Sequence, residues 1–262
     1  MVAGVLTLAV LVTTAVLAPW LAPHDPTRQD LSQDLRRPSL QHPLGQDKLG
    51  RDQLSRVIYG ARVSLQVGAV TVLIAVTIGV TLGALAGYLG GLVDFAVMRV
   101  VDILLAFPGI LLAIAMSAAL GPSLTNVIVA LSLIGWTGYA RLVRAEVLAI
   151  KQREHVEAAV ALGVARPRVL VRHVLPLVVA PVVVQATFGM AGAIVAEASL
   201  SFLGLGVQPP TPSWGAMINE GRTFLLVAPH LTTYPGLAIL ATVLGLNFLG
   251  DGLRDWLDVR AR

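Results

Sequence analysis

Long apolar stretches separated by shorter polar segments dominate the hydrophobic pattern of this chain. A helix needs about 20 mostly apolar residues to cross the hydrocarbon core of a bilayer. Six stretches approach or exceed that length, namely residues 2–21, 63–88, 97–120, 124–146, 175–200 and 231–250. The pattern therefore predicts an all-α polytopic membrane protein with six transmembrane helices.

The composition supports a membrane location. Of 262 residues, 56% are hydrophobic and only 13% are charged, whereas a soluble domain carries about a quarter charged residues. Most of the surface must therefore contact lipid. The absence of cysteine excludes disulfides, thiol catalysis and cysteine-ligated metal centres.

The first apolar stretch is expected to be a retained membrane helix. Small residues near Ala18 and Ala22 could imitate a signal-peptide cleavage site, but no basic residue precedes the stretch, and it is longer than a usual signal-peptide core. The missing basic residues suggest that the natural start lies upstream of Met1. We expect residues 1–62 to form this helix plus an extracytoplasmic segment, and residues 63–262 to form a five-helix core.

Basic residues indicate the orientation. They gather in segment 141–173 and in the C-terminal tail, and basic loops mark the cytoplasmic side of a membrane protein. Segment 23–62 is also basic, so the charge contrast between the two sides is weak. We place both termini and residues 147–174 in the cytoplasm. In this setting basic loops report orientation and are not taken as evidence for nucleic acid binding.

A row of glycines runs along the second apolar stretch at intervals of four residues: Gly79, Gly83, Gly87 and Gly91. Small residues at this spacing let two helices approach closely in lipid. The row favours either packing within this chain or an interface with a second membrane subunit, and the sequence does not choose between them.

The fifth stretch has a narrow stripe of small and polar residues at the same spacing: Gln185, Gly189, Ala193, Glu197 and Ser201. A carboxylate within a span is costly unless it faces protein or water. The stripe could face a translocation path or its outer gate. Alternatively, Glu197 lies near the outer end of the helix and reaches the headgroups.

Catalytic and cofactor motifs are missing. The sequence has no P-loop for ATP, no His-Glu-x-x-His zinc motif and no Gly-x-Ser-x-Gly nucleophile motif. Its five histidines are scattered without helical zinc-site spacing. We therefore expect no catalytic residue, cofactor or metal in this chain, and a membrane enzyme is poorly supported.

A short polar helix is predicted at about 154–163, between the fourth and fifth stretches. Gly163 suits the left-handed position after a helix, and Pro167 suits the start of the next helix. An isolated helix shorter than about 12–15 residues is marginal in water. This segment should therefore dock on a partner, or alternatively lie on the lipid headgroups with its flanking arginines.

The residues of this segment resemble the EAA signature of ABC importer permeases, which forms a coupling helix on the ATPase subunit. The matching positions are Glu157, Ala158, Ala159, Gly163, Leu175 and Pro176. His173 stands where the signature usually has Ile, as in the peptide and nickel branch of the family. Leu177 replaces an Asn expected in that branch, and nothing in the sequence accounts for it.

Three more stretches resemble the "C" subunit of dipeptide and oligopeptide permeases. They are residues 42–62, residues 199–215 and residues 247–255. The resemblance thus covers nearly the whole chain. It implies a six-helix type I permease subunit in the cytoplasmic membrane of a prokaryote.

The resemblance also implies the partners. They would be a homologous second permease, two ATPase subunits that bind ATP and magnesium, and an extracytoplasmic solute-binding protein. Dipeptides or short peptides are the expected substrates, with nickel chelates, glutathione or heme as alternatives in the same architecture. A self-contained secondary transporter is a distant alternative, because the internal repeats and broken helices of such carriers are not evident here.

Overall fold

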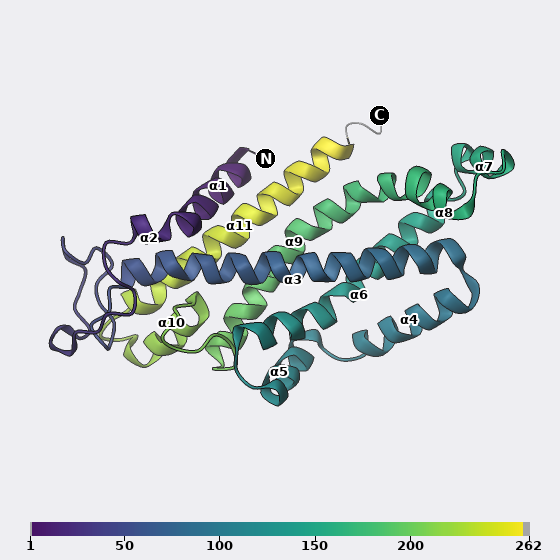
Figure 1. The fold of residues 1–262 in the computed structure, drawn as a ribbon. Coiled ribbons are helices and arrows are strands. Elements are labelled where there is room, and N and C mark those ends of the chain that lie inside the picture. The colour runs from purple at the N-terminus through teal and green to yellow at the C-terminus, as the bar shows by residue number, and fades with distance from the viewer. Residues whose placement is uncertain (1, 259–262) are drawn as a thin grey trace.

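The computed structural model describes residues 2–258, and these residues form a bundle of long helices (Figure 1). The N-terminal half contains α1 (Val2–Val16), α2 (Ala18–Leu21), η1 (Leu31–Gln33), α3 (Gln53–Leu89), α4 (Gly91–Leu105), α5 (Gly109–Leu120) and α6 (Leu124–Ile150). The C-terminal half contains α7 (Glu154–Ala161), α8 (Arg166–Val169), η2 (Leu170–Val174), α9 (Leu175–Phe202), α10 (Trp214–Gly221), η3 (Arg222–Phe224) and α11 (His230–Asp258).

The membrane-spanning helices confirm the all-α class and alter the predicted count. Within residues 2–258, four helices are long and apolar enough to cross a membrane: α3, α6, the continuous helix through α8 and α9, and α11. A fifth span results if α4 and α5 together count as one. Helix α1 is apolar but has only 15 residues.

The expected single helix over residues 97–120 is broken. Helices α4 and α5 meet at an angle of 84°, and Pro108 lies immediately before α5. Proline lacks a backbone N–H, and it disfavours helical geometry at the preceding residue, here Phe107. The apolar composition of this stretch therefore predicted its location in the membrane but not its shape.

Helix α3 begins earlier than its apolar run. The Asp52 side chain caps it by accepting a hydrogen bond from the Ser55 N–H, and the helix then continues for 37 residues. Gln53, Ser55 and Arg56 are buried although they are polar. The domain boundary expected between residues 62 and 63 therefore falls inside one uninterrupted helix.

The glycine row packs α3 against α6. A Cβ atom on Gly79 would lie 2.5 Å from Tyr139 Cβ, and one on Gly83 would lie 2.5 Å from the Ala140 carbonyl oxygen. Gly87 similarly faces the Arg144 carbonyl at 2.9 Å. These three glycines thus serve packing within this chain, one of the two functions that the spacing allowed.

Gly91 does not belong to this row, contrary to expectation. Helix α3 ends at Leu89, and Gly90 and Gly91 have φ angles of +67° and +54°, which L-residues with side chains rarely adopt. A Cβ on Gly91 would have no neighbour within 4 Å. Gly91 therefore serves the turn into α4 rather than the packing of helices.

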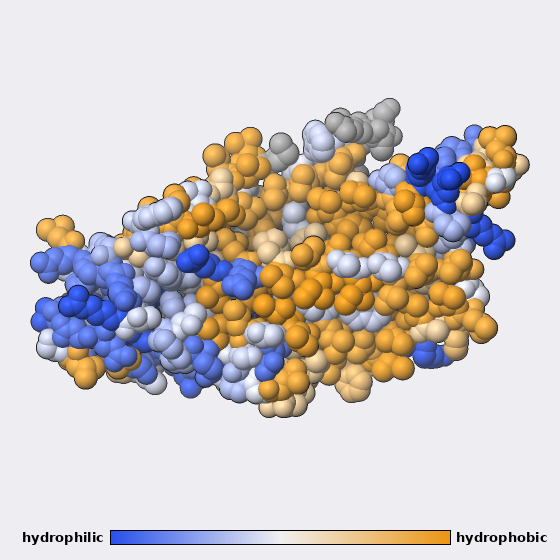
Figure 2. All heavy atoms as spheres, viewed as in Figure 1, coloured by the Kyte–Doolittle hydropathy of each residue, from blue (hydrophilic) through white to orange (hydrophobic). Residues whose placement is uncertain are grey.

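Apolar side chains cover the middle of the molecule, and polar ones gather at its two ends (Figure 2). One polar end contains the segment between α2 and α3 together with α10, and the other surrounds α7 and α8. This distribution fits a protein whose middle lies in hydrocarbon. Buried aliphatic residues fill the interfaces between α3, α6 and α9.

We predict that Gly83→Ala lowers thermal stability, because the added Cβ would collide with the Ala140 backbone. Overpacking of this kind costs about 1–3 kcal/mol. Gly138→Ala in α6 is the matched control, since its Cβ would meet nothing within 4 Å. Thermal unfolding of the detergent-solubilised complex should separate the two variants, and equal melting temperatures would refute the packing assignment.

Candidate functional site

Helix α7 projects from one end of the bundle (Figure 1). Only Val156 and Ala159 are buried among its residues. Val156 joins an aliphatic cluster with Val147 and Ile150 of α6 and with Val178 of α9. The short helix is thus positioned by one buried side against the ends of two spanning helices.

The opposite side of α7 is exposed. Glu157 and Ala158 lie there without burial, and two apolar side chains accompany them, Val160 at 55% exposure and Leu162 at 84%. An exposed carboxylate, a small residue and exposed apolar side chains on one short segment suit a docking site for another protein.

Only a short non-helical turn separates α7 from the helical segment that leads into α9. Gly163 ends the helix with φ of +80°, as expected for a left-handed cap. Pro167 lies in the first turn of α8, and a π-helical turn, η2, leads directly into α9 at Leu175 and Pro176. The predicted Gly163 stop and Pro167 start are confirmed, and α7 is tied to a spanning helix through a short, ordered path.

A second feature is a cavity of about 310 Å³ between α3, α5, α6 and α9. Its lining is mostly apolar, and its polar members include Thr71, Tyr139 and Gln185. Gly189 faces the Tyr139 hydroxyl so closely that a Cβ there would collide with it. Three residues of the predicted stripe, Gln185, Gly189 and Ala193, therefore meet at this cavity.

Glu197 and Ser201, the other two members of the stripe, lie outside the cavity lining. Both are buried. Ser201 Oγ donates to Glu197 Oε1 at 2.7 Å and accepts from the Val207 N–H at 3.3 Å. They join the C-terminal end of α9 to the loop that follows it, and the Glu197 side chain is buried inside the protein.

The sequence of this chain matches a known protein family. Residues 79–262 match the family described as the binding-protein-dependent transport system inner membrane component. The chain belongs to this family. Residues 1–43 also match the N-terminal transmembrane domain of oligopeptide transport permease C.

Relatives and solved structures agree with this assignment. The glutathione transport system permease protein GsiD of Shigella flexneri serotype 5b is 49% identical over 253 residues, which cover 96% of this chain and 84% of GsiD. GsiD of Shigella sonnei is 47% identical with the same coverage. An inward-facing structure of the MetNI methionine ABC transporter has a TM-score of 0.61 at 21% identity, over 77% of this chain and 96% of that one. This chain is thus a permease subunit of an ABC importer.

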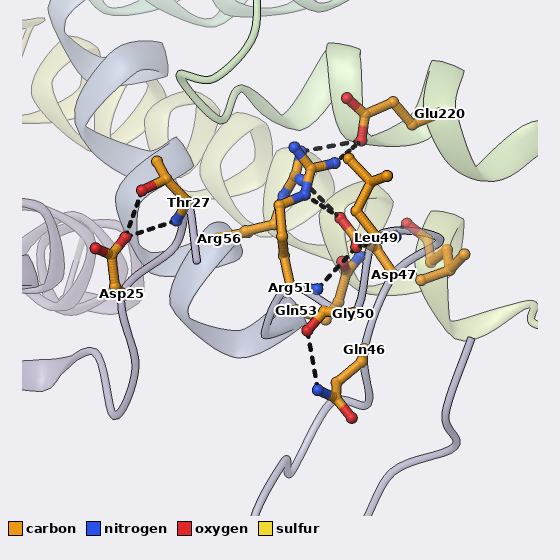
Figure 3. Close-up of polar contacts among 11 residues, drawn as sticks. Asp25, Thr27, Gln46, Asp47, Leu49, Gly50, Arg51, Gln53, Arg56 and Glu220 are labelled. Atoms are coloured by element: carbon orange, nitrogen blue, oxygen red, sulfur yellow. Dashed lines mark hydrogen bonds and ion pairs between the residues drawn. The ribbon is translucent and has the colours of Figure 1, made fainter. Parts of the chain in front are cut away.

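The end of this permease opposite α7 contains a cluster of four charged residues that the sequence did not reveal, three of them buried and Glu220 partly exposed (Figure 3). Asp47 Oδ2 accepts from Arg51 Nε and from Arg56 Nη1, each at 2.6 Å. Glu220 Oε2 of α10 accepts from the same two guanidinium groups at 2.6 and 3.1 Å. The cluster therefore ties the segment before α3 to α10, across more than 160 positions of sequence.

The Glu220 carboxyl lies between the two guanidinium groups and is partly shielded from solvent. Burial raises its pKa, and the positive charge of Arg51 offsets part of that rise. Two arginines facing two carboxylates leave the cluster formally neutral, which lowers the cost of its burial. Removal of one arginine would leave negative charge without compensation.

We predict that Arg51→Met destabilises the folded permease by about 3–5 kcal/mol, since breaking a buried ion pair leaves an unpaired charge behind. Arg37→Met is the matched control, because Arg37 lies exposed in the same segment. Thermal unfolding should show a large loss for the first variant and little change for the second. Equal melting temperatures would mean that the cluster contributes nothing to stability.

Proposed function

We propose that this chain pairs with a homologous permease, two ATPase subunits and an extracytoplasmic solute-binding protein to import short peptides. Glutathione is the first substrate to test, because it is itself a tripeptide and the similar GsiD proteins are named for its transport. Dipeptides are the next class. Nickel chelates and heme stay as alternatives within the same architecture.

The observation that carries the coupling part of this proposal is the exposed side of α7. Glu157 and Ala158 are accessible while Val156 and Ala159 are buried. An ATPase groove could therefore contact the helix without disrupting its attachment to the bundle. Movement of the ATPase subunits would then reach α6 and α9 through the cluster around Val156.

The cavity between α3, α5, α6 and α9 supports a shared translocation path. Its lining carries few polar groups, and in this proposal a second permease completes the enclosure. In this proposal Gln185 and Tyr139 contribute polar groups to the path. Glu197 and Ser201 would control the outer end of α9 rather than contact substrate.

The proposed topology has six spans with both termini in the cytoplasm of a prokaryotic cell. Helices α1 and α2 together would form the first span, and the bent pair α4 and α5 would form the third. In this orientation α7 is cytoplasmic, and the charge cluster around Asp47 and Glu220 faces the solute-binding protein.

The substrate proposal is tested by ATP turnover of the reconstituted complex in lipid. The solute-binding protein is added empty, then loaded with glutathione, with a dipeptide or with a nickel chelate. We expect stimulation with glutathione or dipeptide. Stimulation by the nickel chelate alone would overturn the peptide proposal and keep the importer architecture. This chain reconstituted alone should transport nothing, and transport by it would instead favour a self-contained carrier.

We predict that Glu157→Lys reduces substrate-stimulated ATP turnover about tenfold or more, which corresponds to about 1.4 kcal/mol or more of lost coupling. Charge reversal on an exposed helix should leave the fold and membrane insertion intact. Asp255→Lys is the control, since it reverses one exposed charge outside α7. Full stimulated turnover in Glu157→Lys would show that α7 does not couple the subunits.

A further inference from the structure

Two histidines that are 18 positions apart in sequence meet beside one carboxylate at the end of the bundle opposite α7. His42 Nδ1 lies 2.8 Å and His24 Nδ1 lies 3.7 Å from Asp52 Oδ1. The two imidazole rings are stacked, with centroids 4.5 Å apart. A ligating atom from each of the three residues lies within 4.8 Å of the other two.

Hydrogen bonds hold the Asp52 carboxylate so that one of its oxygen atoms faces the two histidines. Its Oδ2 accepts from the Ser55 N–H at 2.8 Å and from Ser55 Oγ at 2.7 Å, because Asp52 caps α3. The backbone N–H of His24 donates to the same Ser55 hydroxyl at 3.1 Å. The second oxygen, Oδ1, is thus left to face both imidazoles from a fixed position.

The cluster is accessible from a polar cavity of about 210 Å³. The Asp52 side chain is 1% exposed, whereas His42 is 16% and His24 is 39% exposed. The cavity lining is polar and includes Asp30 and Gln46. A small ion could therefore enter from solvent and meet a buried carboxylate flanked by two partly exposed imidazole rings.

We propose that His24, His42 and Asp52 form a binding site for a divalent transition metal of the zinc class. Two imidazole nitrogens and one carboxylate oxygen are a ligand set that zinc takes in proteins, with a fourth position open to water. Bonds of about 2.0–2.1 Å in tetrahedral geometry place ligand atoms about 3.4 Å apart. The observed 2.8 and 3.7 Å lie on either side of this value. The two stacked rings would have to turn toward the ion so that a nitrogen lone pair of each points at it.

Metal binding would replace the direct hydrogen bond between His42 and Asp52. Each histidine must be neutral to act as a ligand, so binding competes with protons. The ion would tie the segment around His24 and His42 to the first turn of α3, beside the cluster of Asp47 and Glu220. This site does not depend on the transported substrate, and its test is independent of the proposed function.

The test uses the assembled permease complex, stripped of metal with a chelator and titrated with Zn²⁺ alone by calorimetry. We expect one zinc ion per permease chain beyond the zinc bound by a His24→Gln, His42→Gln double variant. Each single variant should bind at least tenfold more weakly. His155→Gln is the control, because that histidine lies exposed on α7.

Folding is checked on the same samples. Without metal, the melting temperature of His24→Gln should equal that of the wild type, since His24 is the most exposed of the three residues. Added Zn²⁺ should raise the melting temperature of the wild type and leave the double variant unchanged. Equal zinc stoichiometry and equal thermal response in the wild type and His24→Gln would overturn the proposal.

Discussion

The close approach of α3 to α6 is the constraint on which the rest of this permease depends. Gly79, Gly83 and Gly87 bring the two backbones into contact along one line. In lipid, where the hydrophobic effect adds nothing between helices, such packing is a main source of helix association. The same contact directs Tyr139 toward α9 and the central cavity. It also fixes the end of α6, where Lys151 Nζ donates to the Gly87 carbonyl at 3.0 Å. The cavity and helix α7 are therefore both positioned through one interface.

Helix α7 packs directly against the ends of two of the long helices. The aliphatic cluster under Val156 includes residues at the ends of α6 and α9, among them Val147, Val174 and Val178. Packed protein interiors are nearly incompressible. A displacement of α7 must therefore move the ends of both helices or open a void between them. Because α9 lines the cavity through Gln185 and Gly189, such a displacement would reach the cavity along a single continuous helix.

Local patterns predicted the features that depend on local chemistry. The apolar stretches located every long helix, and the Gly163 stop was correct because a left-handed cap is set by one residue. The sharp angle at Pro108 and the early start of α3 were less predictable. The first depends on how the helices after the proline pack in the fold. The second depends on buried polar residues such as Arg56, which pairs with Asp47 and with Glu220, and Glu220 is far away in sequence. The spacing of Gly91 matched the row, but its backbone conformation places it in a turn.

The two polar ends of the molecule differ in how many contacts hold their elements in place. At the end opposite α7, Trp214 Nε1 donates to the Val57 carbonyl at 2.9 Å, Gly215 contacts the Ala198 backbone, and the Asp47 cluster joins α10 to α3. Several independent contacts must break before these elements separate, so this end moves as one body. Helix α7 has a single buried side and an exposed apolar one. In the proposed importer an ATPase subunit would cover Leu162, and this asymmetry suits a subunit that receives its driving motion from one side of the membrane.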